Sequence, residues 1–324
     1  MLVLLPSAFA FDHELLASHN NSHPRGAEIE YRTYPSDSSS FAGFEGADML
    51  VLASNTQENA EASVRDLPNI KLVQTLAAGP DHLYGLGYNE RITLASGRGL
   101  HDITVTEHAL ALTLSVVRDL ERLHQSQILH TWNHEYVSAQ ASRETESLYT
   151  LNKAKVLIYG FGSIAANLAP ILTTLGASVT GVAQSSGNRH GFPVVAAANA
   201  QREIAEADIV ISLLPYTPAS DKFFNAQFFN QLKKSAIFIN VGRGKTVDES
   251  ALIHVLSSGA LRKAAIDVTS VEPLPADSEL WSTPNLTITP HIAGGRPRNS
   301  EELIAFNALA LLTGSAIRNI VSRS

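Results

Sequence analysis

The segment Lys155-Val-Leu-Ile-Tyr-Gly160-Phe-Gly162-Ser-Ile-Ala165 decides the fold class of this chain. An apolar run leads directly into the pattern G-x-G-x-x-A, which predicts a buried strand followed by a tight turn. The residues after the turn have helical spacing, with apolar side chains at Ile164, Leu168 and Ile171. Because a second strand is predicted at residues 178–182, the segment indicates a strand–turn–helix–strand unit.

The glycine-rich turn predicts a dinucleotide site. Gly160 allows the tight turn, Gly162 lets the backbone approach a pyrophosphate, and Ala165 allows the helix to pack closely on the strand. The helix N-terminus supplies free N–H groups and a partial positive charge, which suit phosphate groups. We therefore expect cofactor contacts from Gly160, Gly162, Ser163 and Ile164.

Short apolar runs alternate with segments of helical spacing along the rest of the chain. Strands are predicted at residues 2–5, 28–32, 49–52, 71–75, 92–94, 154–159, 178–182, 209–213, 236–241, 264–268 and 286–288. Helices are predicted at residues 56–65, 106–124, 164–175, 225–233 and 249–258. Continuously apolar strands in such an alternation indicate an α/β fold with parallel sheets covered on both faces.

Composition bounds the function. The 324 residues suit two domains, and 44% hydrophobic residues suffice for a sizeable core. A net charge of −7 without a basic patch argues against nucleic-acid binding, and no apolar run approaches the ~20 residues of a membrane-spanning helix. The chain has no cysteine, which excludes disulfides and thiolate sites, and its histidines lack ligand spacing, so no metal site is expected.

The N-terminal residues Met1-Leu-Val-Leu-Leu-Pro-Ser-Ala-Phe-Ala10 superficially resemble a signal peptide. No Lys or Arg precedes Arg25, however, and Pro6 interrupts a short apolar segment. We therefore expect a first buried strand and a cytoplasmic protein.

The predicted helix at residues 106–124 is apolar almost all round, which indicates burial in a domain core or against another subunit. The polar, weakly patterned residues 131–147 are interpreted as a loop or linker. Trp132 lies in this segment.

The strand at residues 178–182 is not followed by the acidic residue that usually binds the adenosine ribose of NAD. Ala183 stands there instead, and polar groups that suit a 2′-phosphate come next. The sequence thus favours NADP over NAD, with contacts from Gln184, Ser185, Ser186 and Arg189.

Three further polar residues follow apolar strands, at the edge where ligand sites form in open α/β sheets. Arg243, Glu272 and His291 supply a cation, a carboxylate and an imidazole. Each alone is compatible with a structural role, but together they indicate a catalytic site.

At this point the sequence resembles the D-isomer-specific 2-hydroxyacid dehydrogenases, including glyoxylate and hydroxypyruvate reductases, over nearly the whole chain. The matching blocks are Ala78-Gly79-Pro-Asp81-His82-Leu83, Thr106-Glu107-His108-Ala109-Leu110, Gly160-x-Gly162, Leu214-Pro215-Tyr-Thr217-Pro218, Asn240-x-x-Arg243-Gly244, Asp267-x-x-x-x-Glu272-Pro-Leu-Pro275 and Pro290-His291. The chain departs from the family pattern at Ala165 and at Ala183.

The resemblance implies two Rossmann-like or flavodoxin-like domains with an active site in the cleft between them. A dinucleotide-binding domain at residues 99–293 would be inserted into a substrate domain formed by residues 1–98 and 294–324, and a last helix near residues 300–320 would return to the latter. Such enzymes are usually homodimers joined through the cofactor domains.

The resemblance also implies a role for each site residue in the reduction of a 2-keto acid to a D-2-hydroxy acid. His291 is the general acid, Glu272 orients its ring and favours its protonated form, and Arg243 binds the keto oxygen and the carboxylate. The backbone N–H groups of Ala78 and Gly79 hold the substrate carboxylate. Cofactor contacts are also implied for Leu214, Pro215 and Asp267, the last to the nicotinamide carboxamide.

Several alternatives stay open. A short phosphoglycerate dehydrogenase fits the same blocks, whereas formate dehydrogenases normally carry Gln at the position of Glu272. A dinucleotide-sensing binding protein, like the corepressors of this fold, retains the catalytic residues too. No role is assigned to Asp81, His82, His101, Asp102, Trp132 and Arg296.

Overall fold

The computed structural model describes residues 1–141 and 148–322. The chain divides into two compact units, one formed by Met1–His101 with Arg296–Ser324 and the other by Asp102–Gly295. Each unit contains its own sheet with helices on both faces, so the predicted α/β fold class is confirmed. No helix of the described residues is long and apolar enough to span a membrane.

The first unit is built on a five-stranded sheet with the order β2-β1-β3-β4-β5, in which every pair is parallel. Its strands are β1 (Leu2–Pro6), β2 (Glu30–Tyr34), β3 (Met49–Leu52), β4 (Leu72–Thr75) and β5 (Thr93–Ala95). The N-terminal residues therefore form a strand inside the sheet, as predicted.

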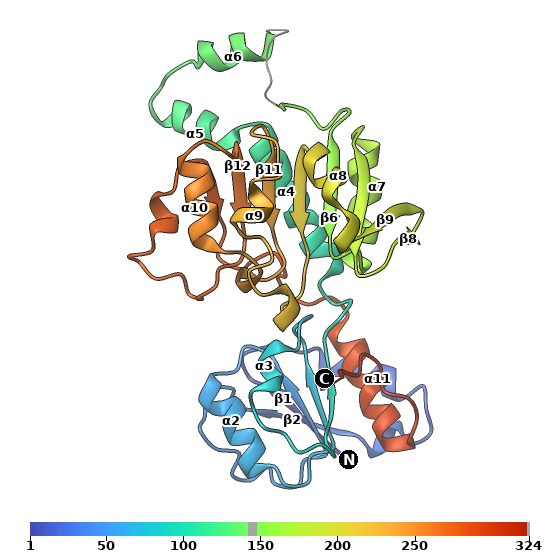
Figure 1. Ribbon diagram of the computed structural model, residues 1–324. Coiled ribbons are helices and arrows are strands. Elements are labelled where there is room, and N and C mark those ends of the chain that lie inside the picture. Colours follow the sequence, from blue (N-terminus) through green and yellow to red (C-terminus); the bar gives the residue numbers. More distant parts are fainter. Residues whose placement is uncertain (142–147, 323–324) are drawn as a thin grey trace. The chain divides into compact units, whose positions relative to one another are not determined.

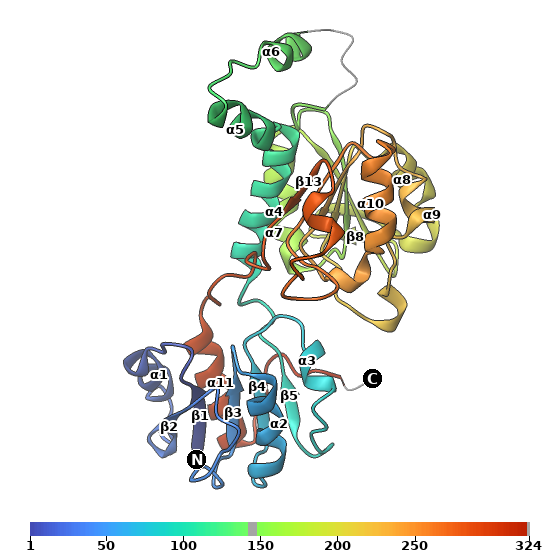
Figure 2. The same ribbon diagram turned by 90° about the vertical axis from the view of Figure 1, so that its left-hand side faces the viewer.

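Helices cover both faces of this sheet, as Figure 2 shows. One layer contains α2 (Gln57–Asp66) and α3 (Asp81–Tyr84), and the other contains α1 (His13–Asn20) and α11 (Ser300–Thr313). The last helix is shorter than predicted because Gly314 adopts a left-handed conformation at φ 71° and ends it.

The second unit is built on an eight-stranded sheet with the order β13-β12-β11-β10-β6-β7-β9-β8. Its strands are β6 (Lys155–Tyr159), β7 (Ser178–Ala183), β8 (Gly187–Arg189), β9 (Phe192–Ala196), β10 (Ile209–Ser212), β11 (Ile237–Asn240), β12 (Lys263–Ile266) and β13 (Leu286–Ile288). Only β8 and β9 pair antiparallel. The chain order reverses between β6 and β10, and ligands bind at such a switch point in open α/β sheets.

Helices also cover both faces of the second sheet (Figure 1). One face packs against α4 (Asp102–Val117) and α7 (Ser163–Thr174), and the other against α8 (Gln201–Glu206), α9 (Ala226–Phe229) and α10 (Glu249–Ser257). Two more helices, α5 (Leu120–Ile128) and α6 (His134–Ala141), contain no buried residue. We call residues 120–141 the α5–α6 arm, and Figure 1 shows it projecting from the rest of this unit.

The structure corrects several sequence predictions. The helix predicted at residues 106–124 is interrupted at Asp119, whose φ of 57° is left-handed, and only one face of α4 is buried. The loop predicted at residues 131–147 contains α6, and residues 142–147 lie outside the described part. The strand predicted at 28–32 begins two residues later, and the helix predicted at 225–233 ends at Phe229.

Candidate active site

Three neighbouring strands of the second unit position the predicted catalytic residues. Strands β11, β12 and β13 lie side by side and parallel, so their carboxyl ends meet at one edge of the sheet. Arg243 follows β11, Glu272 follows β12 and His291 follows β13. The topology therefore brings the three predicted catalytic residues to one edge of the second unit.

Glu272 and His291 form a direct pair. The imidazole Nδ1 of His291 lies 2.6 Å from Oε2 of Glu272. The backbone N–H of Thr269 donates to Oε1 of the same carboxylate at 2.9 Å, which fixes its orientation. The Nε2 atom of His291 has no hydrogen-bond partner within residues 1–141 and 148–322, and 48% of the side chain is exposed.

This pairing changes the acidity of both groups. The hydrogen bond to Glu272 raises the pKa of His291 above its ordinary value, against the opposing effect of burial. Burial acts to raise the pKa of Glu272, but the hydrogen bonds from His291 and Thr269 outweigh it and lower that pKa. The pair therefore favours an imidazolium beside a carboxylate.

Arg243 places a positive charge near this pair. Its charge acts to lower the pKa of both His291 and Glu272. One guanidinium nitrogen, Nη1, donates to the carbonyl oxygen of Gly242 at 2.9 Å, and the side chain is half-buried. The backbone carbonyl of Arg243 accepts from Thr246 Oγ1 at 2.6 Å. A guanidinium held in this way suits an anionic substrate.

Asp267, by contrast, is completely buried. Its Oδ1 atom accepts from Thr289 Oγ1 at 2.6 Å and from the N–H of Ile292 at 3.0 Å, and Oδ2 accepts from the N–H of Ala293 at 2.9 Å. His108 Nε2 lies 3.3 Å from Oδ1. Asp267 thus holds the segment that carries His291. The sequence prediction assigned no role to His108 or Thr289, although His108 lies in a quoted block.

The glycine-rich turn has room for a phosphate group. Gly160 has a φ of 86°, and a Cβ atom there would lie 2.8 Å from the carbonyl oxygen of Leu213. A Cβ at Gly162 would meet nothing within 4 Å. Gly162 is the N-cap of α7 and provides no side-chain cap, so the N–H groups of Ser163 and Ile164 begin a helix that an anion can cap. These residues fit the pyrophosphate of a dinucleotide.

The residues after β7 form a polar surface. Arg189 Nη2 donates to Ser185 Oγ at 2.9 Å, so the guanidinium is held over this loop. Ser186 Oγ accepts from the N–H of Ala196, while Gln184 is exposed. The short hairpin of β8 and β9, which the sequence prediction omits, brings Arg189 back towards Ser185. No acid follows β7, which ends at Ala183.

The predicted contacts Leu214 and Pro215 follow β10, next to the glycine-rich turn. A Cβ at Gly242 would lie 2.6 Å from the carbonyl oxygen of Leu214, so these backbones approach closely. Leu214 is half-buried and Pro215 is exposed. Both therefore lie beside the switch point of the sheet.

Ala78 and Gly79 belong to the first unit, after the end of β4. Their N–H groups donate no hydrogen bond within residues 1–141 and 148–322. His101 Nε2 lies 2.8 Å from the carbonyl oxygen of Leu76, and the N–H of Gly97 donates to the carbonyl oxygen of Ala77 at 2.8 Å. This loop can therefore accept an anion on a fixed backbone.

The other residues without an assigned role lie as follows. Asp81 and His82 begin α3, and Asp102 begins α4. Arg296 Nη2 donates to the carbonyl oxygen of Ala10 at 2.5 Å, and its guanidinium lies over the ring of Phe9. Trp132 is 76% exposed in the α5–α6 arm.

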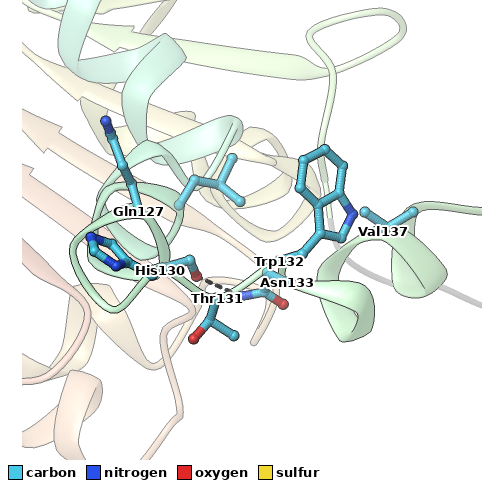
Figure 3. A pocket seen from close by; sticks show the side chains of 8 residues that line it. Gln127, His130, Thr131, Trp132, Asn133 and Val137 are labelled. Atoms are coloured by element: carbon cyan, nitrogen blue, oxygen red, sulfur yellow. Dashed lines mark hydrogen bonds between the residues drawn. The ribbon is translucent and has the colours of Figure 1, made fainter.

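A cavity of about 500 Å³ lies in the α5–α6 arm and contains none of the predicted site residues. Figure 3 shows its lining, with Trp132 and Val137 side by side on an apolar wall. Among residues 1–141 and 148–322, no group of three or more His, Cys, Asp or Glu side chains is placed to hold a metal ion.

Comparison with known proteins agrees with this geometry. The sequence profile "D-isomer specific 2-hydroxyacid dehydrogenase, NAD binding domain" matches residues 110–293. Glyoxylate/hydroxypyruvate reductase B from Escherichia coli is 27% identical over 309 residues, 91% of this chain and 90% of that protein. The reductase of the same name from Escherichia fergusonii is 41% identical over 122 residues, 37% of this chain and 38% of that protein.

Two solved structures are similar along their whole length. A D-isomer specific 2-hydroxyacid dehydrogenase family protein from Aeromonas salmonicida superposes with a TM-score of 0.83 at 26% identity, over 100% of this chain and 99% of that one. A D-isomer specific 2-hydroxyacid dehydrogenase from Xanthobacter autotrophicus, solved with NADPH and MES, has a TM-score of 0.77 at 26% identity, over 99% and 98%.

Proposed function

Because the chain belongs to the D-isomer-specific 2-hydroxyacid dehydrogenase family, we propose that it reduces a small 2-keto acid to a D-2-hydroxy acid with NADPH. Glyoxylate and hydroxypyruvate are the first substrates to consider, because the curated relatives reported above carry these names. The observation that carries the proposal is the pair of His291 and Glu272 at 2.6 Å.

In the proposed mechanism, His291 is the general acid. Glu272 occupies Nδ1, so Nε2 is the atom that delivers a proton to the keto oxygen. The hydrogen bond to Glu272 raises the pKa of His291, which favours the protonated ring that this step needs. Glu272 also stabilises the imidazolium before transfer and orients the ring.

Arg243 binds the same keto oxygen and one carboxylate oxygen of the substrate, which offsets the negative charge that develops on the keto oxygen. The free N–H groups of Ala78 and Gly79 hold the rest of the carboxylate. The first unit would thus provide the substrate domain and the second the cofactor domain.

The cofactor, when bound, supplies the hydride. Gly160, Gly162, Ser163 and Ile164 would hold its pyrophosphate at the start of α7. Leu214 and Pro215 would line its path along the switch point, and Asp267 would contact the carboxamide.

A preference for NADPH is supported by the residues after β7. Arg189 and Ser185 would bind the 2′-phosphate together, with Gln184 and Ser186 beside them, and no acid follows β7 to repel it. The Xanthobacter autotrophicus relative was solved with NADPH.

We also propose a homodimer formed through the cofactor domain. The α5–α6 arm contains no buried residue, yet it exposes large apolar side chains at Leu120, Ile128, Leu129, Trp132 and Val137. Exposed apolar side chains of this kind gain stability when a partner covers them.

Turnover assays test the proposed activity. Oxidation of NADPH, and separately of NADH, is followed with glyoxylate, hydroxypyruvate, pyruvate, and branched and aromatic 2-keto acids. The proposal expects turnover that prefers NADPH. Cofactor binding without turnover would instead support a dinucleotide-sensing protein, and selective oxidation of 3-phosphoglycerate would support a short phosphoglycerate dehydrogenase.

A further inference from the structure

A single buried residue holds the backbone that carries His291. Three consecutive N–H groups, those of His291, Ile292 and Ala293, donate to Asp267. The first donates to its carbonyl oxygen at 2.7 Å, and the next two to its carboxylate oxygens at 3.0 and 2.9 Å. The Asp267 side chain is 0% exposed, so solvent does not compete for these bonds.

The backbone at His291 needs such an anchor. Its φ of 52° lies in the left-handed region, which a residue with a Cβ atom adopts only where its surroundings enforce it. This backbone conformation also directs the imidazole towards Glu272, whose Oε2 atom lies 2.6 Å from Nδ1 of the ring. Rotation of the Asp267 carboxylate would release two of the three bonds that enforce it.

Two side chains prevent that rotation, and donor counting fixes their roles. The hydroxyl of Thr289 donates its single proton to Asp267 Oδ1 at 2.6 Å. The Nε2 atom of His108 lies 2.9 Å from Thr289 Oγ1 and 3.3 Å from Asp267 Oδ1. Because that hydroxyl proton is already used, His108 must carry a proton on Nε2 and donate it to Thr289. The resulting chain runs from His108 through Thr289 to Asp267.

We propose that His108 and Thr289 are positioning residues that fix the Asp267 carboxylate, which in turn holds the left-handed backbone at His291 and presents its imidazole to the substrate. This inference rests on the proposed function for its consequence, which is proton delivery by His291. Because His108 lies in α4, the proposal gives this helix a part in the active site.

The test compares Thr289→Val with Thr289→Ser, and His108→Leu with His108→Gln. Valine and leucine remove the polar group, whereas serine keeps the hydroxyl and glutamine keeps an N–H near the position of Nε2. Thr113→Val is the matched control, because the hydroxyl of this buried threonine of α4 donates to the carbonyl oxygen of Ala109 in its own helix and to no other group of the described residues.

One measurement does not depend on substrate. The Cε1–H resonance of His291, assigned with His291→Gln, is titrated in protein labelled on histidine. Thr289→Val and His108→Leu should lower the titration midpoint towards the ordinary ~6.5, because the ring loses its fixed distance from Glu272. The serine and glutamine variants should restore the wild-type midpoint, and Thr113→Val should leave it unchanged.

A second measurement uses turnover with the 2-keto acid that the wild type reduces. Thr289→Val should lower kcat by roughly 10- to 100-fold, as expected for a misplaced acid, and this loss should exceed any change in the Kd of the cofactor, which Asp267 is also proposed to contact. If the wild type reduces no 2-keto acid, the proposed function fails, and the titration still decides the positioning role.

The inference is overturned if both apolar variants keep the wild-type midpoint, or if Thr113→Val shifts it equally. It is also overturned if the variants weaken cofactor binding and leave kcat unchanged, since Asp267 would then act on the cofactor alone. Should Thr289→Val fail to show a cooperative thermal transition, the His108→Leu and His108→Gln pair decides in the same way.

Discussion

Oε2 of Glu272 lies 2.6 Å from Nδ1 of His291, while Oε1 of the same carboxylate accepts from the backbone of Thr269. The carboxylate therefore spans its own loop and the loop after β13. This relationship orients the imidazole and leaves Nε2 without a hydrogen-bond partner among residues 1–141 and 148–322. It also raises the pKa of His291.

The pH dependence of Glu272→Gln tests this coupling. In the proposed mechanism, keto reduction consumes the proton of His291, so the reaction rate is highest below the pKa of His291 and is lost as the pH rises through it. In the wild type, the midpoint of this loss should lie above ~6.5, the ordinary pKa of histidine. In Glu272→Gln the carboxylate charge is absent, so this midpoint should move to lower pH in a profile of kcat/KM against pH. Asp277→Asn, at an exposed residue of the same loop, is the control. An unchanged midpoint in Glu272→Gln would contradict the account.

Two glycines of the same turn should respond differently to alanine. A Cβ at Gly162 meets no atom within 4 Å, so Gly162→Ala should keep the wild-type Tm but lose cofactor binding, because the methyl group fills the place of the pyrophosphate. Gly160→Ala should be destabilised by about 1–3 kcal/mol, since its φ is left-handed and its Cβ would contact Leu213. Thermal melts and cofactor titration check both, and equal behaviour of the two variants would be the contrary result.

The fold could be predicted where local signals agree with tertiary structure. Residues 156–159 before Gly160 and the strand that precedes Arg243 are fully buried, so their sequences contain little but branched and aromatic side chains. The α5–α6 arm and the β8–β9 hairpin lack such patterns. Their conformations depend on single backbone positions such as Asp119, with its φ of 57°, which composition does not reveal.

Arg189→Ala tests the cofactor preference. The guanidinium is held by Ser185 and faces the loop after β7, so its loss should reduce kcat/KM for NADPH roughly 10- to 100-fold, the factor expected for a charged hydrogen-bond partner. The value for NADH should change little. Arg202→Ala, an exposed arginine of α8 paired with Glu206, is the matched control. Equal losses with both cofactors would argue against 2′-phosphate binding by Arg189.

The oligomeric state tests the role of the arm. We expect the wild type to sediment as a dimer at micromolar concentration and Trp132→Ser to shift towards monomer, because the indole is the most exposed large apolar side chain of the arm. Trp281→Ser alters another exposed tryptophan, outside the arm, and should stay dimeric. A monomeric wild type would refute the proposed dimer.

The pair of Glu272 and His291 is easier to predict from the sequence than the residues that hold it in position. Glu272 and His291 each follow a strand of the sheet within a recognisable block, so their meeting at one sheet edge follows from the strand order. His108 gives no comparable signal, because a lone histidine on an apolar helix is usually structural. Its contact with Thr289 depends on how α4 packs against the sheet. For Asp267 the sequence predicts only a cofactor contact, since the burial of its carboxylate cannot be inferred from its neighbours in the sequence.

The most direct test is NADPH oxidation with glyoxylate and hydroxypyruvate by the wild type and by His291→Gln, at saturating cofactor. If His291 is the acid of a 2-keto acid reductase, the wild type turns over and the variant loses roughly 10²- to 10⁴-fold in kcat while binding NADPH with the same Kd. A variant that retains the wild-type kcat, or a wild type that reduces none of the 2-keto acids tested with either cofactor, would contradict the account.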